Sequence, residues 1–235
     1  MIAAAHRAHV SLLLLGACLL GTSATTAHAQ RSVEAFLDEP ERENAVRLTV
    51  EMDPALAFGV GYVRTLPIDV EGFSRRLGLH LDLTTILGGS SWDVTGGASM
   101  PLFEGPGPNV LATIDLELKI AQNDVHTALV YGYGVALRPG WFDPSWYLAA
   151  EASLRGTIAA SLVHRDSYRA EVSGVADGTY LTGQLALYVG GVVGFHIERQ
   201  VVLGLRFAWR VPYTLQSYAP WYQPYTVDLE LAWRF

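Results

Sequence analysis

Apolar and polar residues alternate along most of this chain, from Ala45 to the carboxy terminus. Strict alternation over several residues is typical of a β-strand whose two faces meet different surroundings. The clearest run lies between Ala112 and Ile120, where every second residue is apolar and Thr, Asp, Glu and Lys fill the positions between. The pattern predicts about ten strands of roughly 9–13 residues, although eight or twelve strands also fit it.

Connections of unequal length separate these runs. Short ones are expected near residues 53, 89 and 123 and at residues 139–144 and 198–200, and longer ones at residues 64–76, 164–178 and 212–224. An even number of antiparallel strands places both ends of a barrel on the same side. The segments 164–178 and 212–224 are therefore expected on the side opposite the chain ends.

The composition of the two faces indicates which one points inward. The polar face combines arginines, short acids and many glycines, and Lys119 is the only lysine of the chain, whereas solvated surfaces are usually rich in lysine. Glycines 59, 61, 132 and 134 are expected to leave room for long arginines from the opposite wall. The predicted fold is all-β: a single closed antiparallel up-and-down transmembrane β-barrel whose charges face the lumen.

Buried charges require partners, so the inward face is expected to form a polar network. Its predicted members are Arg47, Glu51, His80, Asp82, Asp115, Glu117, Glu151, Arg155, Arg206, Arg210, Asp228, Glu230 and Arg234. Aromatic residues gather near the predicted strand ends, where membrane interfaces place girdles of such side chains. They are Trp92, Tyr131, Trp146, Trp209, Tyr225, Trp233 and Phe235.

The closing segment, residues 227–235, is apolar at every second position and ends on Phe235. It resembles the recognition signal of Gram-negative outer-membrane β-barrel proteins, a resemblance that covers the chain generically and names no single member. It implies localisation in the cell outer membrane, contact with outer-membrane lipid, and recognition by the barrel assembly machinery during insertion. The implied assembly signal comprises Leu229, Leu231, Trp233 and Phe235. To close the barrel, this segment is expected to pair with residues 46–52.

The amino-terminal residues 1–29 are predicted to form a signal peptide. Arg7 precedes an apolar run at residues 10–20 that is too short to span a bilayer, and Ala27-His28-Ala29 forms a small-x-small cleavage site. A lipoprotein reading, with Cys18 lipidated, is the alternative. Residues 30–44 are then a short periplasmic segment, and residues 45–235 form the barrel.

Composition excludes several classes of site. Cys18 is the only cysteine, so cleavage leaves no disulfide, thiolate cluster or cysteine nucleophile. A net charge of −7 argues against a nucleic-acid partner. We find no metal-ligand spacing and no phosphate-binding glycine loop, and we expect neither a metal nor a cofactor.

Two histidine motifs are candidates for chemistry. His80 and Asp82 share a face and suit a base with its orienting acid, and His164-Arg165-Asp166-Ser167 suits a nucleophile cluster. We favour non-catalytic interpretations: a packed polar pair in the lumen for the first motif and a solvated loop for the second. The chain also lacks a Gly-x-Ser-x-Gly turn that would present a nucleophile.

The predicted role is therefore non-enzymatic: a small outer-membrane barrel with a structural, surface-interaction or narrow, porin-like channel role, its lumen largely filled by charged side chains. The alternatives are a rim-active barrel hydrolase acting on lipid or peptide, and a soluble periplasmic barrel that binds a hydrophobic ligand.

Overall fold

The computed structural model describes residues 43–52, 56–70, 73–87, 91–103, 107–122, 125–171, 176–181, 185–197, 200–212 and 225–235. The predicted signal peptide, Cys18 and most of the predicted periplasmic segment lie outside these residues, as does most of the predicted loop at 212–224. Those expectations remain predictions.

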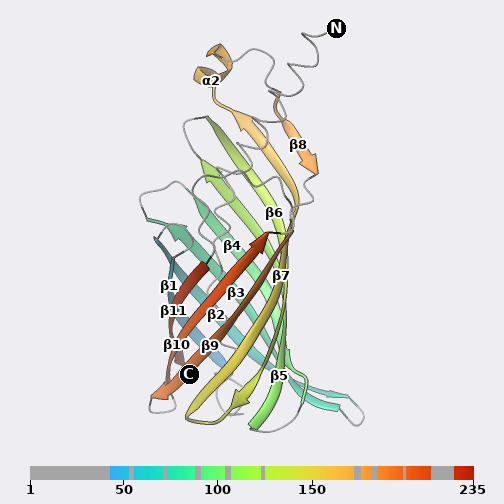
Figure 1. Ribbon diagram of the computed structural model, residues 1–235, viewed down its shortest axis with the longest axis vertical. Coiled ribbons are helices and arrows are strands. Elements are labelled where there is room, and N and C mark those ends of the chain that lie inside the picture. The colour runs from blue at the N-terminus through green and yellow to red at the C-terminus, as the bar shows by residue number, and fades with distance from the viewer. Residues whose placement is uncertain are drawn as a thin grey trace.

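The described chain is almost entirely β-strand (Figure 1). Its elements in chain order are β1 (Asn44–Met52), β2 (Leu56–Val70), β3 (Phe73–Ile86), β4 (Trp92–Pro101), β5 (Gly107–Gln122), β6 (His126–Phe142), β7 (Trp146–His164), α2 (Asp166–Glu171), β8 (Gly178–Leu181), β9 (Leu185–Ile197), β10 (Val201–Pro212) and β11 (Tyr225–Arg234). No helix among the described residues is long and apolar enough to cross a membrane.

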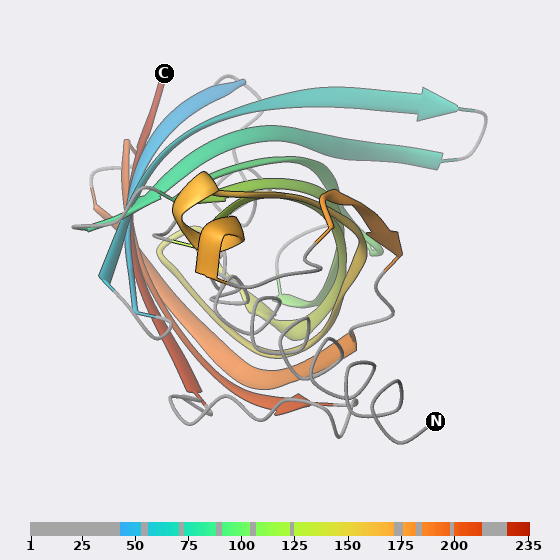
Figure 2. The same cartoon turned by 90° about the horizontal axis from the view of Figure 1, so that it is seen from above.

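Ten of the strands close into one antiparallel barrel, which confirms the predicted fold. Successive strands pair in order, β7 pairs with β9, and β1 pairs with β11 from Ala45↔Arg234 to Met52↔Val227, as expected for the closing strand. The additional strand β8 pairs only with the upper part of β7. Figure 2 looks along the barrel and shows the ring of strands.

The barrel wall is uneven in height. The strands β5, β6 and β7 contain 16, 17 and 19 residues, longer than predicted, and β6 and β7 rise beyond the other strands toward α2 and β8 (Figure 1). The start of β1 and the carboxy terminus lie side by side at the opposite end, where Asn44 and Phe235 exchange backbone hydrogen bonds of 3.2 and 2.9 Å. We call the part of β6 and β7 beyond the other strands, together with α2 and β8, the projection.

Two predicted connections are wrong. Residues 64–76 are mostly strand, because β2 runs to Val70 and β3 begins at Phe73. Pro67 is tolerated there because it lies beyond the last residue of β2 that pairs with β1, where no ladder hydrogen bond is lost.

The predicted turn at residues 139–144 also shortens, since β6 continues to Phe142. Pro139 lies within the strand opposite Val110 of β5, while the pairing of β6 with β7 skips Arg138 and Pro139. A proline without an N–H donor is accommodated by that gap. The expected loop at 164–178 contains α2, and its end is the start of β8.

Candidate functional site in the barrel lumen

The two faces of the barrel wall differ sharply in chemistry. Every barrel strand exposes large apolar side chains on its outer face: Val46, Leu48, Phe58, Val60, Leu81, Val94, Ile114, Leu116, Val135, Leu137, Leu148, Val189, Leu203, Leu205, Leu229 and Leu231. All seven aromatic residues predicted to lie near strand ends are exposed as well. Most charged side chains of the barrel strands are buried on the inner face. This is the reverse of a soluble barrel, which keeps apolar residues inside.

Arg47 and Asp82 form an ion pair across an intervening strand. In the register, Arg47 of β1 lies opposite Gly61 of β2, and Gly61 lies opposite Asp82 of β3. The Nε of Arg47 donates to the Asp82 carboxylate at 2.7 Å, and Nη2 donates to the same oxygen. A Cβ at Gly61 would collide with both side chains, so the absence of a side chain there permits the pair.

His80 and Asp115 repeat this arrangement two strands further on. His80 of β3, Gly97 of β4 and Asp115 of β5 lie in one register line, and His80 Nε2 is 3.0 Å from the Asp115 carboxylate. Of the predicted lumen pair, His80 thus contacts Asp115, while Asp82 contacts Arg47. His80 and Asp82 share a face of β3 but are separated by two residue rises. Each has a partner two strands away, across the glycine of the strand between.

Arg155 of β7 reaches toward β5 over the glycines of β6. Its Nη1 lies 3.6 Å from the Glu117 carboxylate, and Gly134 faces both Asp115 and the Arg155 stem. The predicted purpose of the glycines thus needs correction. Gly61, Gly132 and Gly134 leave room for charged side chains of flanking strands, and Gly59 for the hydroxyl groups of Thr49 and Thr84, whereas an arginine from the opposite wall was expected.

Glu151 is the centre of a longer chain of ion pairs. Its carboxylate accepts from Arg138 Nε at 3.0 Å and from Arg206 Nε and Nη2 at 2.9 and 2.7 Å. Arg206 also donates to Asp228 at 2.7 Å. These ion pairs run from β6 to β11, and the hydroxyl groups of Thr113, Ser153 and Thr226 hydrogen-bond to their members.

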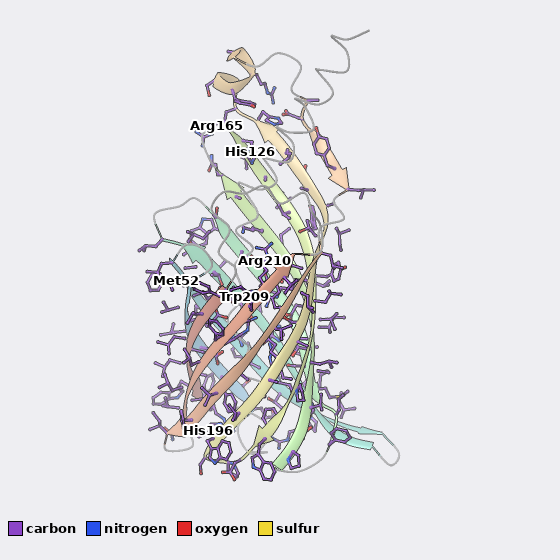
Figure 3. All side chains as sticks on the ribbon, in the orientation of Figure 1. Met52, His126, Arg165, His196, Trp209 and Arg210 are labelled. Atoms are coloured by element: carbon purple, nitrogen blue, oxygen red, sulfur yellow. The ribbon has the colours of Figure 1, made fainter. Side chains whose placement is uncertain are left out.

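Three arginines of the inner wall surround the ring of Tyr188 on β9. The guanidinium carbons of Arg155, Arg206 and Arg210 lie 5.5, 6.0 and 5.9 Å from its ring centroid, within the range of cation–π contacts. Arg210 is half-buried and lies near the rim of the shorter strands, beside Trp209 (Figure 3).

The remaining predicted lumen residues belong to the seam between β1 and β11. Glu51, Glu230 and Arg234 are buried, and Thr49 pairs with Glu230 while Glu51 pairs with Asp228. Sequence reasoning did not include Arg138, Thr113, Thr226 or Tyr188 in the network. All four follow from the alternation, because they share the inward positions of strands β5, β6, β9 and β11.

A second polar cluster lies in the projection, away from the lumen network. His126 of β6 and His164 of β7 are directly opposite each other and both are buried, with ring centroids 6.1 Å apart. Figure 3 shows His126 well beyond Met52 and Trp209, whereas His196 lies near the opposite end. Burial lowers the pKa of His126 below its ordinary value, and the neighbouring His164 lowers it further.

His164 has a carboxylate partner that the sequence did not indicate. Asp177 accepts from the backbone N–H of His164 at 2.8 Å and lies 3.1 Å from its Nδ1, and Arg169 of α2 donates to the same carboxylate. These hydrogen bonds and charges lower the pKa of Asp177. Asp166 and Ser167, the predicted neighbours in a nucleophile cluster, are exposed at the start of α2.

Within the described segments, no three His, Cys, Asp or Glu side chains gather closely enough to hold a metal ion among them.

No family model matches this chain, and no curated protein matches it. Among solved structures, the chain is similar to the β-domain of the Bordetella autotransporter Brka, at 11% identity and a TM-score of 0.38 over 82% of this chain and 99% of that one. It is also similar to the translocator domain of autotransporter NalP from Neisseria meningitidis, at 11% identity and a TM-score of 0.35 over 98% of each chain. Both likenesses are too distant to assign a function.

Proposed function

We propose that this protein is an outer-membrane β-barrel with a structural or surface-interaction role, whose outer face contacts lipid. The observation that carries this proposal is the continuous band of exposed apolar side chains around the barrel, backed by charged residues on the inner face. Exposing such a band to water would be costly, at about 25 cal/mol for each Å² of apolar surface that water contacts. Transmembrane barrels carry apolar residues outside and polar residues inside.

Fractionation of cells that make the full chain tests the location. The protein is expected in the outer-membrane fraction, and the folded form is expected to migrate differently from the heated form in detergent gels. Recovery in the soluble periplasmic fraction would contradict the proposal and favour the soluble alternative.

We also propose that the lumen does not serve as an open diffusion pore. The ion pairs of Arg47, His80, Arg155 and Glu151 lie along the wall, and their side chains are almost completely shielded from solvent. Barrels near eight strands are filled by their own side chains, whereas barrels of sixteen strands enclose a channel.

In this proposal the projection is the part of the protein that contacts the cell exterior.

Planar-bilayer recordings with the purified barrel test this point. The wild type is expected to show conductance far below that of general porins. The variant E151A removes the centre of the chain from β6 to β11 and is expected to raise conductance or its noise. Porin-like conductance of the wild type would contradict a closed lumen.

Catalysis at the rim is tested through the imidazole–carboxylate pair of the projection. His164 with Asp177 resembles a general base with its orienting acid. We propose that the protein is not an enzyme, so H164A is expected to leave lipid or peptide release at the background of the wild type. Release by the wild type that H164A abolishes would establish the hydrolase alternative.

A further inference from the structure

We propose that His126 and His164 together bind one divalent transition-metal ion in the projection, with Asp177 orienting His164. This inference does not depend on the proposed function, because it concerns the strand ends beyond the apolar band. It also departs from the sequence-based expectation that the chain has no metal site.

The backbone brings the two imidazoles together. His126 and His164 are register partners on β6 and β7, so their side chains project from the same face of adjacent strands. Their ring centroids are 6.1 Å apart with planes inclined by 57°. A zinc–nitrogen bond is about 2.0 Å long, which places an imidazole centroid about 3.2 Å from the metal. Two rings that share one ion then have centroids about 5.2 Å apart at a tetrahedral angle and at most about 6.4 Å apart when they lie on opposite sides of the ion. The observed separation lies within that range.

Asp177 fixes which nitrogen of His164 is available to a metal. Its carboxylate accepts a hydrogen bond from a protonated Nδ1 at 3.1 Å, which leaves Nε2 as the ring nitrogen with a lone pair. Metal-binding histidines usually donate their other N–H to a carboxylate or carbonyl in this way. Arg169 holds Asp177 in turn, and the ring of Tyr168 stacks on His164 with centroids 5.8 Å apart.

The chemistry of the donors selects the ion. Neutral imidazole suits copper, zinc and nickel, whereas magnesium and calcium prefer oxygen ligands. With two protein nitrogens, water molecules complete the coordination, and among divalent first-row ions Cu²⁺ binds such a site most tightly.

Titration of the folded full-length barrel with Cu²⁺, followed by calorimetry and electron paramagnetic resonance, tests the site. The wild type is expected to bind one Cu²⁺ with a spectrum typical of two ring nitrogens, more tightly than Zn²⁺ and without response to Mg²⁺. H126A and H164A are each expected to weaken binding at least tenfold, and D177N, which keeps both ligands, about tenfold. H196A is the matched control, because His196 lies at the opposite end of the barrel, and it is expected to bind like the wild type.

Gel migration of the unheated and heated variants shows whether each one folds, and binding is compared only among folded forms. If H126A or H164A misfolds, the conservative variants H126Q and H164Q replace it. The proposal would be overturned if Cu²⁺ still bound to both H126A and H164A as it binds to the wild type. It would also be overturned if the wild-type spectrum showed a single nitrogen ligand that is lost in H164A but kept in H126A. Unaltered binding in D177N would overturn the role of Asp177.

Discussion

Arg47 reaches Asp82 by passing over Gly61, the residue that lies opposite both of them in the register. The same relationship joins His80 to Asp115 over Gly97. In both cases a glycine on the middle strand opens the space in which two charged side chains from the flanking strands meet. Between β1 and β5, the inward glycines of β2 and β4 therefore separate pairs of inward charges, and the ion pairs follow the barrel wall.

Gly97 and Gly96 are neighbours on β4 that allow a direct test of this arrangement. A Cβ at Gly97 would collide with Asp115, with His80 and with the Ile114 carbonyl, whereas a Cβ at Gly96 would meet its nearest atoms at 3.8 Å. G97A is expected to destabilise the barrel by about 1–3 kcal/mol, as overpacking does, and G96A by much less. Urea unfolding of the barrel in lipid vesicles measures both. Equal midpoints for the two variants would contradict a steric role of Gly97.

Glu151 is expected to be the most sensitive acid of the lumen. It bridges Arg138 and Arg206, and its removal leaves two buried guanidinium groups without this carboxylate. Breaking a buried pair by removing one partner costs about 3–5 kcal/mol, so E151A is expected to lose that much unfolding free energy.

The control for this substitution is E117A. The Glu117 side chain is 14% exposed and lies 3.6 Å from Arg155, so its attraction is weaker and its surroundings are less dry. The loss of unfolding free energy is expected to be clearly smaller in the same vesicles. A loss in E117A as large as that in E151A would show that position in the chain of ion pairs does not matter.

The sequence was sufficient to predict the barrel and to tell its inner face from its outer face. Both depend on the alternation of apolar and polar residues, which can be seen within each short segment. It also indicated that β1 and β11 close the ring, since the first and last strands must pair in any such barrel. The partners of the charges were beyond its reach. His80 was assigned to Asp82, although the register places it beside Gly97 and Asp115, and register depends on the strand offset across the whole sheet.

The ends of the strands were the other difficulty. Residues 64–76 were predicted as a connection, yet β2 continues to Val70 in pairing with β3. Beyond Arg64 it no longer pairs with β1, so Pro67 costs no hydrogen bond there. Asp177 was missed because it follows His164 by 13 residues across a connection that contains α2. No periodicity relates such a pair, so only the folded connection brings it together.

Leu116 and Leu181 test whether the apolar band lies in lipid. Both are highly exposed, at 67% and 87%, but Leu116 lies in the middle of β5 while Leu181 ends β8 in the projection. L116R is expected to cost about 2–4 kcal/mol of unfolding free energy in vesicles, the cost of an arginine near the bilayer midplane. L181R is expected to cost almost nothing, because its side chain meets water. A similar cost for both variants, or none for L116R, would contradict membrane burial of the band.

Phe235 is expected to matter for assembly in cells more than for the stability of the finished barrel. Its closing contacts with Asn44 are made by the backbone, and its side chain is 57% exposed, so F235A leaves those hydrogen bonds in place. We expect F235A to lower the amount of barrel in the outer membrane several-fold while its refolding in detergent and its urea midpoint stay close to those of the wild type. The matched control is F195A, which removes another exposed aromatic side chain, 55% exposed, from the β9 position that pairs with Trp146 and Leu203. Because Phe195 lies outside the closing strand, F195A is expected to reach normal levels. An equal loss of membrane-inserted protein in both variants would assign the effect to lipid contact and remove the special role of the terminal residue.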